Sequence, residues 1–262
     1  MSSTGSGTKP AQELVHVEHV MGTAVSFRIR LQPGDTTGGA EQALERACDE
    51  LHGADEIFST WKPESPLNRI RGGFLSLDDA PAIIEEVLDL SGHVRTLSSG
   101  WFDPWSMPGG VDPTGLVKGW AVERALGALR VPEVVAACVN AGGDVAVFGR
   151  PDGAPRWRIG IRHPWRPEAL ACIVLVDDAV ATSGTYERGS HLVDPRTGER
   201  RTSAASATVV GPSLAVADGL ATALAVGGDE VLTLLGAITG YEGYLVRTDG
   251  SEGWTEGMPF AS

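Results

Sequence analysis

The sequence lacks an excess of positive charge. Its 262 residues include 21 Lys and Arg against 34 Asp and Glu, which gives a formal net charge of −13 at pH 7. Surfaces that bind nucleic acid or anionic lipid are rich in basic side chains. No apolar run approaches the roughly 20 residues that a membrane-spanning helix needs. We therefore expect neither nucleic acid nor a membrane among the partners of this chain.

Cysteine is also scarce. The three cysteines, Cys48, Cys138 and Cys172, lie far apart, and the sequence contains no CxxC pair or other zinc-type spacing. This pattern indicates buried free thiols in a reducing compartment. Residues 1–14 read as a flexible tail, and its first ten residues are rich in Ser, Gly and Thr without the apolar segment of a signal peptide. The sequence therefore predicts a cytoplasmic protein.

Two common phosphate-binding motifs are missing as well. The chain has neither the GxGxxG pattern of a dinucleotide-binding turn nor the GxxxxGK[ST] pattern of a P-loop. It also shows no internal repeat. With 42% hydrophobic residues the chain can nevertheless bury a full core, and we expect residues 15–262 to form a single domain.

Hydrophobic spacing predicts several helices. Residues 40–59 repeat apolar side chains at helical intervals. A second helix is expected from Pro81 to Ser99, with Asp79 as its N-terminal cap and Gly100 at its end. The remaining predicted helices cover residues 116–130, 213–226 and 229–238.

Strands are expected in clusters between these helices. Residues 15–31 read as two strands around a turn at Met21-Gly22-Thr23. Further strands are predicted at 134–140, 144–148, 157–163, 170–177, 179–183, 190–194, 205–211 and 242–247. Because the order is not a strict βαβ alternation, we expect an α+β fold with a mixed, largely antiparallel sheet flanked by helices.

Two segments suggest chemistry at phosphate or metal. Asp218 and Thr222 are four residues apart and share one face of an otherwise small and apolar helix. They could ligate Mg²⁺ or Ca²⁺, or Asp218 could lie near a helix start with Thr222 bonded back to the helix. The segment from Val111 to Gly119 enters a helix and carries Lys118, which suits a phosphate or a plain capped helix start.

Three further features have both a functional and a structural interpretation. His191 lies in a polar segment and could act as a general base or have a structural role. The run from Asn140 to Asp144 allows close approach of a ligand, or forms a hairpin turn. Aromatic side chains in the loops around Trp61 and Trp101 could stack on a planar ligand or fill gaps beneath the loops.

Taken in order, seven blocks of the sequence resemble the FAD:protein FMN transferase (ApbE) family. The match covers roughly residues 16–250. The blocks are Met21–Thr23, Phe58–Trp61, Gly100–Pro104, Val111–Val122, Asn140–Asp144, Ser183–Gly198 and Ala217–Leu224.

The resemblance implies an ApbE-like (T-fold-like) α+β architecture and a metal-dependent reaction. Members of the family cleave FAD with a divalent cation, usually Mg²⁺ with Ca²⁺ or Mn²⁺ as alternatives. They attach FMN through a phosphoester bond to a Thr or Ser of an acceptor protein and release AMP. Two alternatives are hydrolysis of FAD to FMN and AMP, and flavin binding without catalysis.

The resemblance also implies roles for individual residues. His191 matches the base that accepts the proton of the acceptor hydroxyl. The metal ligands would be Asp218, Thr222 and the carbonyl of Gly115. The positions that match the FAD site are Met21, Trp61, Trp101, Phe102, Asp103, Asp112, Lys118 and Leu192.

Three features depart from the family pattern. Trp61 replaces the usual tyrosine, which keeps an aromatic ring but loses the phenol hydroxyl. The segment between Asp103 and Asp112 is short. The export signal or lipid-anchor cysteine of many relatives is not seen, so we expect a cytoplasmic acceptor.

Overall fold

A computed structural model describes residues 12–34, 37–150, 154–184, 192–201 and 203–262. Its central feature is an eight-stranded sheet in which every neighbouring pair is antiparallel. The strand order is β1-β2-β3-β4-β7-β8-β9-β10. The strands are β1 (Glu13–Val20), β2 (Thr23–Leu31), β3 (Val134–Ala141), β4 (Asp144–Phe148), β7 (Ala179–Gly184), β8 (Ala204–Gly211), β9 (Glu242–Arg247) and β10 (Glu252–Trp254). The predicted α+β class with a largely antiparallel sheet is confirmed.

Two tight hairpins follow from local sequence. Met21 and Gly22 join β1 to β2 with φ angles of 53° and 70°. Gly142 and Gly143 join β3 to β4 with φ angles of 58° and 98°. Positive φ at both central residues matches the right-handed twist of the flanking strands. The run from Asn140 to Asp144 is therefore a hairpin turn, the structural one of its two interpretations.

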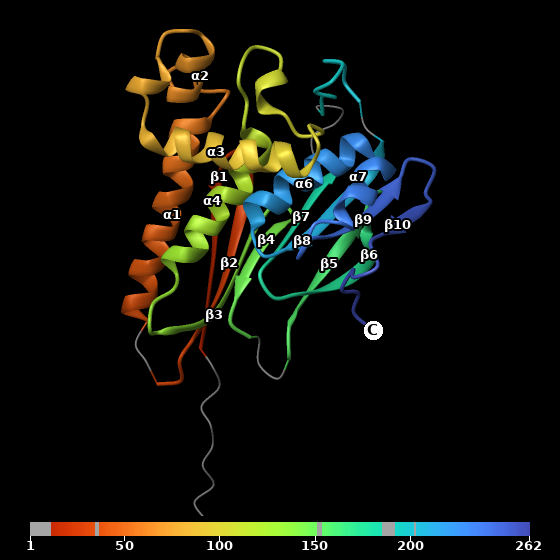
Figure 1. The fold of residues 1–262 in the computed structure, drawn as a ribbon. Helices are drawn as coiled ribbons and strands as arrows, with labels where there is room; N and C mark the ends of the chain where they lie inside the picture. Colours follow the sequence, from red (N-terminus) through yellow and green to blue (C-terminus); the bar gives the residue numbers. More distant parts are fainter. Residues whose placement is uncertain (1–11, 35–36, 151–153, 185–191, 202) are drawn as a thin grey trace, which may run out of the picture.

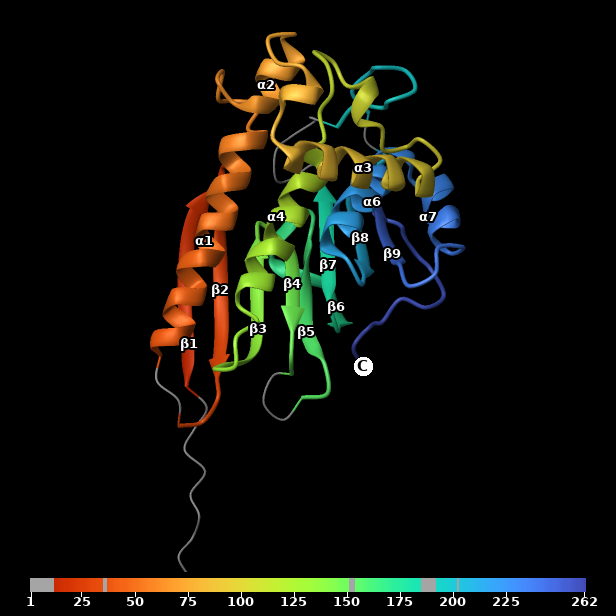
Figure 2. The same cartoon turned by 60° about the vertical axis from the view of Figure 1, so that its left-hand side comes forward.

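Helices cover one face of the sheet, as Figures 1 and 2 show. Their apolar sides pack on the sheet in one large core, in which α6 is buried along nearly its whole length. The helices are α1 (Gly38–Phe58), α2 (Pro66–Arg71), α3 (Ala82–Leu97), α4 (Thr114–Ala128), α6 (Leu214–Gly227) and α7 (Asp229–Leu235), with short 3₁₀ turns at Leu77–Asp79 and Pro104–Ser106.

The opposite face of β4, β7, β8 and β9 is covered by a separate hairpin of β5 (Trp157–His163) and β6 (Arg166–Val176). A second core forms there, with Ile161 and Val174 of the hairpin against Val180 and Tyr244 of the large sheet. Since both faces of these central strands are buried, their interior positions carry small, apolar or hydroxyl side chains and no charged ones.

Some local predictions were wrong. Asp79 does not cap α3: it ends a 3₁₀ turn, where Ser76 bonds both its backbone N–H and its carboxylate, and α3 begins after Pro81. Of the predicted strand 190–194, the described residues 192–194 form only an isolated bridge between Val193 and Arg200. The three cysteines are free, as expected, but half-buried rather than buried.

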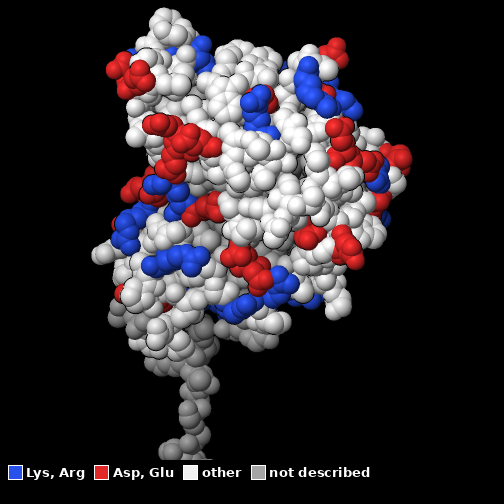
Figure 3. Space-filling view, in the orientation of Figure 1, with Lys and Arg blue, Asp and Glu red and all other residues white. Residues whose placement is uncertain are grey.

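The chemistry of the surface agrees with the composition. On the face shown in Figure 3, acidic and basic side chains are interspersed within a largely uncharged surface. Each helix in the described ranges is too short or too polar to cross a membrane.

Candidate functional site

A pocket of about 350 Å³ lies where α4 and α6 meet the end of β7 and the loop between α3 and α4. Figures 1 and 2 both show α2 and this loop at the same end of the molecule. The pocket is lined by Thr60, Trp101, Phe102, Asp103, Pro104, Met107, Asp112, Thr114, Gly115, Lys118, Thr182, Ser183, Gly184, Leu192, Val193, Asp218 and Thr222. Its volume falls within the range of small-molecule sites.

Oxygen atoms converge on one wall of this pocket. Thr222 Oγ1 lies 3.4 Å from the carbonyl oxygen of Gly115 and 3.4 Å from Ser183 Oγ. One turn earlier on α6, the Asp218 carboxylate is almost fully buried and accepts a hydrogen bond of 2.9 Å from the backbone N–H of Gly119. A carboxylate, a hydroxyl and a carbonyl are the ligand types of hard divalent cations.

Gly119 allows α4 to approach α6 closely enough to form this wall. A Cβ atom at residue 119 would lie 2.6 Å from the carbonyl oxygen of Leu214 and 2.9 Å from Cβ of Asp218. Only a residue without a side chain fits such a contact between two helix backbones. The sequence thus fixes the distance between the start of α4, which carries Gly115 and Lys118, and the face of α6 that carries Asp218.

A buried ion pair positions the pocket's lysine. Lys118 Nζ lies 2.5 Å from Oδ2 of Asp144, whose side chain is completely buried at the start of β4. The other carboxylate oxygen of Asp144 accepts a hydrogen bond of 2.9 Å from the backbone N–H of Thr182. Asp144 therefore joins α4 to β7 beneath the pocket, and it holds the ammonium group of Lys118 at the pocket wall.

Trp101 and Phe102 form an aromatic wall. Trp101 is 2% exposed and packs against Gly227, where a Cβ atom would lie 2.7 Å from the indole ring. The Arg196 guanidinium carbon lies 3.2 Å from the centroid of the Trp101 ring, and the indole N–H donates to Glu230. Such cation–π stacking fixes the ring plane, so Arg196 and Gly227 hold the indole rigidly in this wall of the pocket.

The short segment from Asp103 to Asp112 is folded back on itself. The backbone N–H of Asp112 donates to the carbonyl of Pro104 at 2.9 Å. Arg71 of α2 pairs with the Asp112 carboxylate at 2.7 Å and donates to the carbonyl of Pro108, while Arg95 of α3 pairs with Asp103 at 2.8 Å. Two arginines thus fix both acidic ends of the segment at the rim of the pocket.

Most of the site residues expected from the sequence meet in this one pocket. The residues that line it are Trp101, Phe102, Asp103, Asp112, Gly115, Lys118, Leu192, Asp218 and Thr222. Met21 lies instead in the β1–β2 turn and packs against the core. Trp61 is 92% exposed and lines a separate shallow depression near α2. His191 lies outside the described residues.

Several residues of the site were not singled out from the sequence. Asp144 and Arg71 act through their ion pairs, while Thr60, Thr182 and Ser183 contribute to the pocket wall. Asp144 could have been found: a carboxylate that opens a wholly apolar strand after Gly-Gly must have a partner. Arg71 had no comparable signal, because its partners are 37 to 41 residues away along the chain.

The chain is similar to known proteins in sequence. The ApbE family profile matches residues 105–245. A FAD:protein FMN transferase of Vibrio cholerae serotype O1 is 36% identical, over 85% of this chain and 84% of that protein. One from Rhodobacter capsulatus is 34% identical over 53% of this chain, and the matched part spans only 28% of that protein's length.

Solved structures share the fold. The flavin transferase ApbE from Vibrio cholerae superposes with a TM-score of 0.80 and 21% identity in the superposition, covering 94% of this chain and 98% of that one. The ApbE protein from Thermotoga maritima gives a TM-score of 0.79 at 21% identity, covering 94% and 97%. The eight-stranded sheet and its helices are therefore arranged as in these proteins.

Proposed function

This chain belongs to the ApbE family, and we propose that it is a FAD:protein FMN transferase. In the proposed reaction a Thr or Ser hydroxyl oxygen of an acceptor protein attacks the phosphorus atom of the FMN half of FAD. A phosphoester bond to FMN forms, the pyrophosphate bond to the AMP half breaks, and AMP leaves.

One observation carries this proposal. A single pocket combines three oxygen donors, a lysine and an aromatic wall, which are the groups that a flavin dinucleotide with a divalent cation requires. The donors come from Gly115, Asp218 and Thr222, and the positive charge comes from Lys118. Fold likeness alone would not support an activity, because one fold can host unrelated functions.

The residues present fit a divalent cation. All three donors are oxygen atoms, one of them a buried carboxylate, and this set suits Mg²⁺, with Ca²⁺ or Mn²⁺ as alternatives. Bound there, the cation would neutralise negative charge on the pyrophosphate.

The protein's own side chains would hold FAD in place. Lys118, fixed by Asp144, puts a positive charge beside the phosphates. Trp101 and Phe102 would bind the flat ring system of FAD, and Leu192 closes the same pocket from the opposite segment. We include Asp103 and Asp112 as polar contacts of FAD at the rim. Met21 and Trp61 lie outside the pocket lining, and we do not assign them a direct contact.

The attacking hydroxyl must lose its proton. We propose that His191 accepts it, on the basis of the sequence resemblance alone. A positioned general base contributes about 10²–10⁴ in rate, so His191→Ala should slow transfer by about that factor while FAD still binds.

The test is intact-protein mass spectrometry of candidate acceptor proteins incubated with this protein, FAD and Mg²⁺. We expect the acceptor to gain the mass of FMN less one water, and we expect AMP to be released in equal amount. Asp218→Asn, which removes the carboxylate charge but keeps the shape, should abolish the gain. Asp249→Asn, at an exposed turn outside the pocket, is the matched control and should transfer normally.

Two other results would point to the alternative functions. Release of FMN and AMP at the same rate with or without an acceptor would identify a FAD pyrophosphatase. Tight binding of FAD with no cleavage under any metal would identify a flavin-binding protein. Normal transfer by Asp218→Asn would refute the assigned metal ligands.

A further inference from the structure

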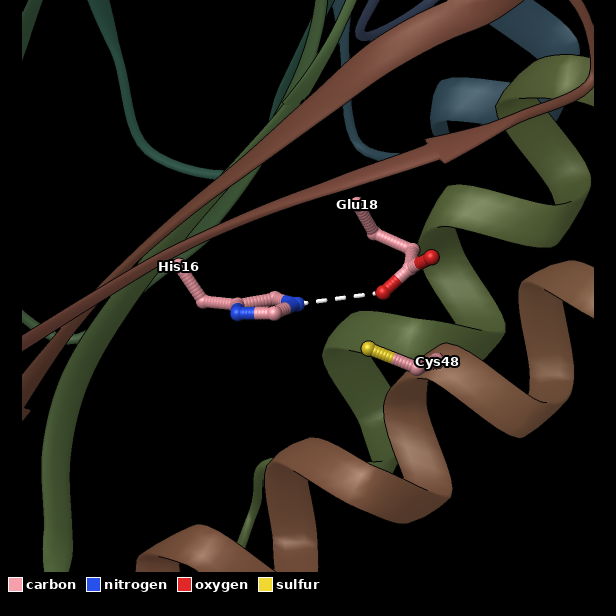
Figure 4. Close-up of side chains that lie close together, drawn as sticks. All are labelled: His16, Glu18 and Cys48. Carbon is pink, nitrogen blue, oxygen red and sulfur yellow. Dashed lines mark hydrogen bonds and ion pairs between the residues drawn. The ribbon is translucent and has the colours of Figure 1, made fainter.

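A second cluster of metal-ligating side chains lies away from the pocket, between β1 and α1. His16, Glu18 and Cys48 each offer one ligand atom, and these atoms all lie within 4.8 Å of one another. Figure 4 shows His16 and Glu18 projecting from β1 toward Cys48 on α1. No sequence pattern predicts this cluster, because its members are up to 32 residues apart.

The backbone explains why the side chains meet. His16 and Glu18 are two residues apart on β1 and therefore point to the same face of the strand. Cys48 and His52 are four residues apart on α1 and share one face of the helix. Since β1 packs against α1, two pairs of ligand-type residues from two regular elements face each other.

The cluster is already held together by its carboxylate. Glu18 bonds the ring nitrogen of His16 at 3.1 Å through one oxygen and that of His52 at 3.2 Å through the other. These contacts hold the pKa of Glu18 below its ordinary value, so it is charged at neutral pH. The side chains of His16 and Glu18 are 36% and 26% exposed, which leaves a path for an ion from solvent.

We propose that His16, Glu18 and Cys48 bind Zn²⁺, with water as the fourth ligand. Imidazole, carboxylate and thiolate together select a zinc-class ion over Mg²⁺ or Ca²⁺. This site is independent of the pocket and of the proposed transferase activity. It would fasten β1, which lies at the edge of the sheet and among the described strands pairs with β2 alone, to helix α1.

The distances suit a tetrahedral zinc ion. Zinc bonds of about 2.0–2.3 Å place neighbouring ligand atoms about 3.3–3.6 Å apart. The nitrogen of His16 and the oxygen of Glu18 are 3.1 Å apart, and the ligand atoms of all three residues lie within 4.8 Å of one another, so small side-chain movements would bring them to this spacing. Before binding, Cys48 is a neutral thiol, because burial and the nearby Glu18 raise its pKa to about 11. Binding therefore releases one proton, and the thiolate and carboxylate balance the two charges of the ion.

His52 has a different part in this proposal. It bonds the Glu18 oxygen that faces away from His16, so it positions the carboxylate rather than ligating the ion. Loss of such an outer partner typically lowers metal affinity by about 10–100-fold. His52→Ala should therefore weaken binding by about that factor and still leave the thiolate bound to the metal.

The test titrates the reduced, metal-free, full-length protein with Co²⁺ and then displaces it with Zn²⁺, followed by absorption spectroscopy. Cobalt bound to a thiolate gives a sulfur-to-metal charge-transfer band. We expect one equivalent of Co²⁺ to produce this band and Zn²⁺ to abolish it. Cys48→Ala should lack the band, whereas Cys172→Ala, which removes another half-buried thiol with a pKa near 11, should keep it.

Two more variants separate this site from the pocket and from a folding defect. Asp218→Asn should keep the band, because it alters only the pocket. His16→Gln keeps the thiol but removes the imidazole ligand, and it should lower Co²⁺ affinity more than His52→Ala does. The proposal fails if the wild-type protein shows no thiolate band, if Cys48→Ala retains it, or if His16→Gln binds Co²⁺ as the wild type does.

Discussion

The contact between α4 and α6 at Gly119 provides the sharpest test of how the pocket is built. In Gly119→Ala the new methyl group would lie 2.6 Å from the carbonyl oxygen of Leu214. That oxygen belongs to the backbone of a buried helix and cannot rotate away. Relieving the contact requires α6 to shift by several tenths of an ångström, which opens the packing around Asp218.

The magnitude follows from two opposing terms. Overpacking a filled core costs about 1–3 kcal/mol, and replacing a helical glycine by alanine returns about 0.5–1 kcal/mol. Gly119→Ala should therefore lose up to about 2.5 kcal/mol in the free energy of unfolding. Gly127→Ala, on the same helix with nothing within 4 Å of its Cβ position, should gain about 0.5–1 kcal/mol. Because the gain from alanine applies to both, the two variants should differ by the overpacking cost of about 1–3 kcal/mol, or about 2–12 °C in melting temperature.

The assay is urea denaturation together with FAD binding measured by flavin fluorescence. Because the N–H of Gly119 donates to the Asp218 carboxylate, Gly119→Ala should also weaken FAD binding in the presence of Mg²⁺, and Gly127→Ala should not. If Gly119→Ala is as stable as Gly127→Ala, the close approach of these helices is not what the structure indicates, and the reasoning is refuted.

Three further predictions concern other parts of the molecule. Asp144→Ala removes the buried carboxylate that pairs with Lys118 and should cost about 3–5 kcal/mol, with Asp144→Asn costing less. Equal urea midpoints for wild type and Asp144→Ala would contradict this. Burial raises the pKa of Cys138 to about 11. Iodoacetamide at pH 8 should therefore label this thiol at least about 100-fold more slowly in the native protein than in the unfolded protein. Equal labelling rates would show that the native protein has an accessible thiolate. Arg156 holds the pKa of Asp177 below its ordinary value, so this carboxylate stabilises the fold above about pH 4, and the stabilisation is lost as the pH falls. In a series of melting temperatures measured against pH, Asp177→Asn should reduce the fall in stability at acid pH. An unchanged fall would exclude the Arg156–Asp177 pair as its source.

Local patterns were enough to predict most of the secondary structure. The helix expected at 40–59 is α1, and the end predicted at Gly100 has a φ of +82° with its N–H bonded to the carbonyl of Arg95. Apolar periodicity and glycine turns act over a few residues, so they can be read directly from the sequence. The failures have local causes too. The carboxylate of Asp194 accepts a hydrogen bond from the backbone N–H of Arg196 in a turn, where the sequence predicts the end of a strand at 190–194.

Contacts between distant segments could not be predicted from such patterns. The spacing of Asp218 and Thr222 indicated a shared helix face, but nothing local placed the Gly115 carbonyl beside them. Trp61 is exposed in the loop before α2, and its spacing from other aromatic residues could not show whether it faces the pocket. Where the candidate site was anticipated, the resemblance to a family supplied the information that periodicity lacks.

The two kinds of element that line the pocket can change independently during evolution. The oxygen donors and Lys118 belong to α4 and α6, two helices that pack closely against each other at Gly119. The aromatic wall and Leu192 belong to connecting loops. A substitution in a loop can therefore alter which molecule reaches the pocket without disturbing the packed helices. A lineage carrying this fold could acquire new acceptors by loop variation, while substitutions at positions such as Gly119 would be removed by selection.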